Sequence, residues 1–149
     1  MLTYRAMASR TGDFSAGVRQ AAIYLWTAPT SACGLVFLPF IRLTGGGYQV
    51  VDGVLELYGG LVRTFLRDCT FLPGGAIAMT LGHVVLGVDR HALHISRDHE
   101  RIHVRQCERW GPLFIPAYLL ASLWIALHSR GRDPYRDNPF EREAYDLAP

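Results

Sequence analysis

Residues 99–103 have the sequence His-Glu-Arg-Ile-His, and the predicted roles of the other segments depend on this motif. Positions i and i+4 of an α-helix lie on one face, so the imidazoles of His99 and His103 can hold one metal ion. Glu100 lies beside them and can accept a proton from a water on that metal. The pattern predicts a zinc site with its own general base if it lies on a helix and if a third ligand exists.

A helix is expected around the motif, from about Arg90 to Trp110. Asp89 precedes it as a capping residue, and a Gly-Pro pair ends it. The motif therefore falls mid-helix. One stripe at helical spacing should face inward, and it holds Ala92, Ile95, Ser96, His99, His103, Gln106 and Trp110.

Two histidines need a third zinc ligand from elsewhere, and a carboxylate on a later helix is a common solution. Asn138 followed by proline is a helix start, and the short helix after it carries Glu141 and Glu143. We place Glu141 first because its helical neighbours orient it inward. Glu143 and, more weakly, Asp146 are the alternatives.

Hydrolysis of a carbonyl compound would need a donor for the developing negative charge. Tyr145, Tyr135 and His128 are candidates among which the sequence does not choose, and Tyr145 is carried forward as a catalytic residue beside Glu100. The strand ending near Leu86 could present its edge to an extended peptide, so a peptide or protein is the expected substrate.

The chain of 149 residues is 50% hydrophobic and 19% charged, which favours membrane contact or a heavily buried core. A net charge of +2 is too small to indicate a nucleic-acid partner. Three isolated cysteines predict buried free thiols, with Cys107 as a minority candidate for a metal ligand. The sequence leaves the oligomeric state open.

Residues 20–41 contain no charged side chain and are bracketed by Arg19 and Arg42. Their length fits one membrane crossing of about 20 residues, but Pro29 should break or kink a helix. A kinked transmembrane helix, a re-entrant or interfacial helical hairpin, and a buried pair of short helices all fit. Association with an inner membrane is expected, with a cytoplasmic location as the alternative.

The remaining elements predict an α+β fold with short antiparallel strands. A hairpin is expected over 48–58, a short helix over 61–71, a strand pair or one strand bent at Gly82 over 76–88, and a hydrophobic helix over 117–127. The last short helix would carry the third ligand. We divide the chain into an N-terminal hydrophobic segment, residues 1–44, and a metal-binding domain, residues 45–149.

Two stretches resemble the zincin metallopeptidases of the gluzincin type. They are AMTLGHVVLG, followed by a helix with HERIHVRQ, and the tail NPFEREAY, which resembles the E-x-x-A helix of gluzincins. The resemblance implies His99, His103 and Glu141 as zinc ligands and Glu100 as the catalytic base. Gluzincins often have Asp where this chain has Tyr145. The same span also resembles an uncharacterised family of small bacterial proteins.

These observations lead to a first hypothesis of a zinc-dependent peptidase-like protein at a membrane. The alternative is a zincin relative that binds zinc without hydrolysis and acts as a sensor or structural protein. A third hypothesis is a small membrane protein in which the motif is incidental.

Overall fold

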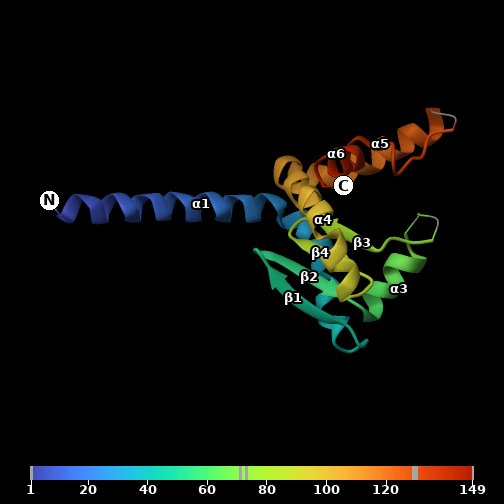
Figure 1. Ribbon diagram of the computed structural model, residues 1–149, viewed down its shortest axis with the longest axis horizontal. Coiled ribbons are helices and arrows are strands. Elements are labelled where there is room, and N and C mark those ends of the chain that lie inside the picture. The colour runs from blue at the N-terminus through green and yellow to red at the C-terminus, as the bar shows by residue number, and fades with distance from the viewer. Residues whose placement is uncertain (1, 71, 73, 129–130, 149) are drawn as a thin grey trace.

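The computed structural model describes residues 2–70, 72, 74–128 and 131–148, with side chains from residue 15 onward. A small four-stranded sheet is combined with a long N-terminal helix and several shorter helices (Figure 1). The predicted α+β class is confirmed.

The sheet consists of two hairpins laid side by side. Its strands are β1 (Gly47–Val51), β2 (Val54–Tyr58), β3 (Ala78–Leu81) and β4 (Val84–Gly87), in the order β1-β2-β4-β3. The positive φ angles of Asp52 and Gly53 make the first turn, and that of Gly82 makes the second. Each hairpin is antiparallel, but β2 and β4 pair in parallel, so the expectation of antiparallel strands throughout was wrong at this junction.

β4 is a central strand, which corrects the expectation that the strand ending near Leu86 offers a free edge. It lies between β2 and β3, and all four of its residues are buried. Parallel pairing with β2 uses the side of β4 that was expected to be open. The edge next to the metal-motif helix belongs to β3 instead.

The main core lies between the sheet and α3 (Gly60–Asp68) and contains Leu57, Val62, Leu66 and Leu86. The helix is shorter than the predicted 61–71, and Phe71 lies outside the described residues. Ile41 of α2 (Leu38–Ile41) is fully buried in the same core. The N-terminal segment therefore shares a core with the rest of the chain.

The N-terminal helix α1 (Leu2–Leu35) runs through Pro29, so the expected break at this proline does not occur. Contacts on both sides of Pro29 hold the helix against the folded domain. Before it, the Thr27 hydroxyl lies 3.0 Å from His83 Nδ1. After it, the Thr30 hydroxyl donates to the Gly111 carbonyl at 3.0 Å, and the His83 amide donates to Ser31 Oγ.

Helix α4 (Arg90–Trp110) has the predicted bounds, and the carboxylate of Asp89 accepts from the Ala92 amide at 2.8 Å. Most of the predicted stripe is buried or half-buried, but Ile95 is 61% exposed and Trp110 is 41% exposed. The C-terminal helix packs on the second half of α4, so Ile95 in the first half has no such cover.

The hydrophobic helix and the tail helix form as predicted. A short 3₁₀ turn, η1 (Gly111–Leu113), leads into α5 (Phe114–His128), and α6 (Pro139–Leu147) follows. Asn138 caps α6 by accepting from the Phe140 amide at 3.0 Å. Its amide group also donates to the Tyr118 carbonyl and Ser122 Oγ, which fixes the start of α6 against α5.

The cysteines are free thiols as predicted, but only Cys107 is buried. Burial is the leading cause that raises the pKa of the Cys107 thiol to about 12, so it is a neutral side chain of the interior. Cys33 and Cys69 are exposed, which corrects the expectation of burial for these two.

A buried carboxylate on β2 attaches α4 to the sheet, on a side of the helix that faces away from His99 and His103. Glu56 is 2% exposed, and both of its oxygens lie 3.0 Å from the Arg97 guanidinium. Gln49 donates to it at 2.6 Å. Burial raises the pKa of Glu56, but the bonds from Arg97 and Gln49 outweigh burial, and the pKa is lowered from its ordinary value.

This pair predicts a stability that depends on pH. A lowered pKa in the folded state contributes stability above the unfolded-state pKa, and this stability is lost as pH falls through the folded-state pKa. Glu56→Gln should lower the free energy of unfolding by about 1–2 kcal/mol at pH 7, because the half-buried Arg97 guanidinium loses its charged partner. Urea denaturation from pH 7 to pH 3 should show the difference shrinking in acid. Asp98→Asn, at an exposed carboxylate of α4, is the matched control, and a deficit independent of pH would contradict this account.

Candidate metal centre

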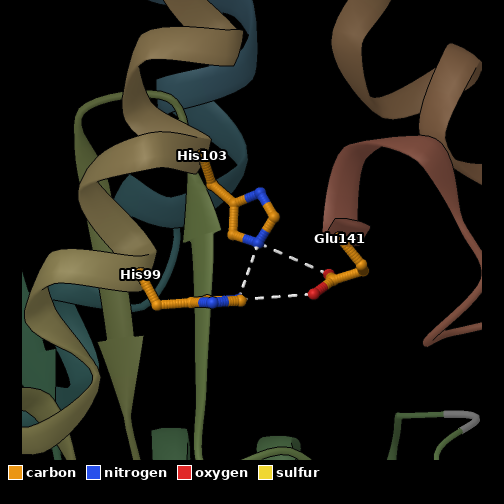
Figure 2. A group of neighbouring side chains, drawn as sticks. All are labelled: His99, His103 and Glu141. Atoms are coloured by element: carbon orange, nitrogen blue, oxygen red, sulfur yellow. Dashed lines mark hydrogen bonds and ion pairs between the residues drawn. The ribbon is translucent and has the colours of Figure 1, made fainter. Parts of the chain in front are cut away.

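The structure brings His99, His103 and Glu141 together, although Glu141 lies 38 residues beyond His103 in the sequence (Figure 2). Their ligand atoms all lie within 4.8 Å of one another, so the group could hold a metal ion. The two Nε2 atoms are 3.2 Å apart. Glu141 Oε2 lies 3.3 Å from His99 Nε2, and Oε1 lies 3.4 Å from His103 Nε2.

The spacing of these atoms fits a tetrahedral ion. Ligands bound at about 2.0–2.1 Å in a tetrahedron lie about 3.3–3.4 Å from one another. Glu141 Oε2 is also one of two buried side-chain polar atoms that make no hydrogen bond within the described chain. A buried carboxylate oxygen without a donor is costly, and a cation would satisfy it. The donor set of two imidazoles and one carboxylate is one that Zn²⁺ accepts.

Gln106 fixes which nitrogen of His103 faces the group. The Gln106 side chain is fully buried, and its Nε2 donates to the Phe140 carbonyl and to Glu143 Oε2. Its Oε1 is therefore the acceptor for His103 Nδ1–H at 2.8 Å. Since Nδ1 carries the proton in neutral His103, Nε2 presents a lone pair toward Glu141.

Tyr118 on α5 holds the carboxylate of Glu141, and the sequence reasoning missed it. The phenol donates to Glu141 Oε1 at 2.6 Å. Burial raises the pKa of Glu141, but its close contacts with His103 and His99 and the hydrogen bond from Tyr118 more than offset this effect and lower the pKa to about 2. Glu141 is therefore an anion at neutral pH. A tyrosine in the first half of a hydrophobic helix was the available signal.

Glu100 shares an apolar cavity with this group. Its carboxylate is 6% exposed, and Thr80 on the edge strand β3 donates to Oε2 at 2.6 Å. The cavity, of about 160 Å³, is lined by Glu100, His103 and Glu141 together with residues of β3 and α5. Burial raises the pKa of Glu100, against the opposing effects of His103 and Thr80. A raised pKa increases the affinity of this carboxylate for a proton.

Of the other predicted site residues, two tyrosines lie near the metal-binding group, and the remaining candidates do not belong to it. The Tyr145 ring lies 4.7 Å from the His99 ring, and Tyr135 lines the cavity beside Glu141. His128 is exposed at the end of α5 and stacks on Trp124. Glu143 turns toward Gln106 and Arg109, and the metal-binding group does not include it. Asp146 is exposed, and Cys107 lies outside the group.

Comparison with known proteins gives no family for this chain. No family model, curated protein or solved structure matches it. The chemistry of the site must therefore be argued from the geometry above.

The geometry predicts one zinc ion per chain after purification with zinc present. His99→Ala and Glu141→Gln should each abolish this content, because either change leaves two ligands where three are needed. Metal content measured by mass spectrometry on the gel-filtered protein checks the result.

Glu143→Gln serves as the matched control on the same helix and should retain the metal, since Glu143 contacts Gln106 and Arg109. Loss of zinc from Glu143→Gln, together with retention by Glu141→Gln, would show that the wrong glutamate has been assigned.

Proposed function

We propose that the protein is a zinc-dependent, peptidase-like hydrolase. The observation that carries this proposal is the placement of Glu100 on the same cavity as His103 and Glu141, two of the three residues that could hold a metal. When bound, Zn²⁺ supplies a Lewis acid that activates a water and polarises a carbonyl oxygen. The protein supplies the base, the orientation of the ligands and an apolar wall that excludes bulk water.

Glu100 has the role of proton carrier in this proposal. It accepts a proton from the attacking water and delivers it to the leaving amine. Thr80 orients the carboxylate by its bond to Oε2. Burial raises the pKa of Glu100 and so increases the proton affinity of its carboxylate, which suits a general base.

Tyr145 and Tyr135 are the proposed donors to the oxyanion, because the Tyr145 ring lies against His99 and Tyr135 lines the cavity with Glu141. The short edge strand β3 has no second strand paired to it in the described chain, so its outer side could accept a substrate backbone beside Glu100. An extended peptide with an apolar side chain in the cavity is the substrate class that this arrangement favours.

Glu100→Gln separates catalysis from metal binding. The variant should bind zinc like the wild type, because Glu100 is not in the metal-binding group, but cleavage should fall by at least about 100-fold without the proton carrier. Cleavage of a casein or fluorogenic peptide library, with metal content measured in parallel, tests this outcome. Undiminished cleavage by the variant would contradict the assigned role.

A second candidate is a zinc-binding protein without hydrolytic activity, and the size of the cavity favours it. At about 160 Å³ the cavity is smaller than the ~300–1,000 Å³ of most ligand pockets. Wild-type protein that holds zinc but cleaves no peptide would select this candidate.

Two helical runs among the described residues are long and apolar enough to cross a membrane: Ser15–Ile41, and a run within Arg90–His128. We propose that they lie at the membrane surface instead. α5 is about 22 Å long by its 15 residues, shorter than the ~30 Å hydrocarbon core. The inner face of α1 packs on the domain around Thr27 and Thr30, so a crossing would carry the charged side chains of α4 into lipid.

The outer face of α5 makes this proposal testable. Leu120 is 65% exposed and Trp124 is 64% exposed. Flotation with phospholipid vesicles should recover the wild-type protein, and Leu120→Glu with Trp124→Glu should reduce the floating fraction several-fold, because charge is costly in the acyl region. Leu61→Glu, at an exposed leucine of α3, is the control. Equal flotation of all variants would argue against membrane contact through α5.

A further inference from the structure

A second cavity, of about 360 Å³, lies between α1 and the outer face of α4. Gln20 and Tyr24, one turn apart on α1, line one side. Arg101 and Arg105, one turn apart on α4, line the other. At 100° per residue these arginines lie on the opposite side of α4 from His99, so the cavity is separate from the metal centre.

The Arg101 guanidinium lines this cavity, and its hydrogen bonding is incomplete. Its Nη2 donates to the Val51 carbonyl at 2.6 Å, but Nη1 is buried and makes no hydrogen bond within the described chain. The nearest buried carboxylate, Glu56, already binds Arg97 through both oxygens and lies 3.7 Å from Arg101. One carboxylate thus serves two guanidinium groups, and a buried donor is left without an acceptor.

Two acidic residues, Asp52 and Glu108, also line the cavity, but neither forms an ion pair with Arg105 within the described chain. Glu108 lies 3.0 Å from Nε2 of His83, which occupies one of its oxygens. Asp52 is 4.0 Å from Arg101, and its side chain is 86% exposed, where water screens it. Arg105 is exposed and directed to the same cavity.

We propose that this cavity binds a phosphate group, held between Arg101 and Arg105 with the Gln20 amide as a further donor. Paired guanidinium forks match the several oxygens of a phosphate. The cavity is more than large enough for one phosphate group. Its position between α1 and α4 means that a bound anion would join the N-terminal helix to the helix that carries the metal motif.

Two sources offer this chemistry, free phosphate and the headgroup of an anionic phospholipid. The cavity lies next to the apolar part of α1, because Gln20 is the first residue of the charge-free stretch 20–41. The proposal does not depend on zinc or on hydrolysis, and it can be tested on metal-free protein.

The first arm of the test is calorimetric titration of the full chain with inorganic phosphate, at an ionic strength fixed with chloride. Wild-type protein should show saturable binding, and Arg105→Gln should weaken it about tenfold, as loss of one charge-assisted contact predicts. Arg105 is exposed and has no structural bond in the described chain, so the variant should fold. Arg67→Gln, at an exposed arginine of α3, is the control and should bind phosphate like the wild type.

The second arm compares vesicles of phosphatidylcholine with and without phosphatidylglycerol. If the headgroup is the source, the part of binding that depends on phosphatidylglycerol should fall in Arg105→Gln, and inorganic phosphate should compete with it. If free phosphate is the source, only the first arm should separate the two proteins. Arg105→Gln that matches the wild type in both arms would overturn the proposal.

Discussion

The candidate metal centre depends on one buried amide. Gln106 binds His103 through its oxygen and binds the Phe140 carbonyl and Glu143 through its nitrogen, so one side chain both orients an imidazole and attaches α6 to α4. Attachment of α6 delivers Glu141 to the histidine pair. The support of His103 comes from the motif helix itself.

Contacts on two sides hold α4 in place, and the two sets of contacts have different roles. On the inner side, Thr80, Tyr118 and Gln106 arrange the carboxylates and an imidazole around a small apolar cavity. On the opposite side, Glu56 pairs with Arg97 and secures α4 to the sheet, while Thr27 of α1 is linked to Glu108 of α4 through His83. A helix fixed in this way can hold two histidines in position without help from a metal.

Local sequence signals were sufficient to predict where helices begin and end, but not which distant side chains contact one another in the folded chain. The bounds of α4 followed from Asp89 and the Gly-Pro pair, and the start of α6 followed from Asn138. The nearness of Glu141 to the histidines could be proposed from motif spacing. The roles of Thr80 and Tyr118 could not, because each contact joins residues 20 or more positions apart. Pro29 failed as a break signal because packing on both sides of it outweighs its local preference.

The most direct test of the account is an anomalous diffraction measurement at the zinc absorption edge on crystals grown with zinc. The account predicts one strong peak per chain, about 2.0–2.2 Å from His99 Nε2, His103 Nε2 and a carboxylate oxygen of Glu141. A peak that lacks Glu141 among its ligands, or no peak between the two imidazoles, would contradict it.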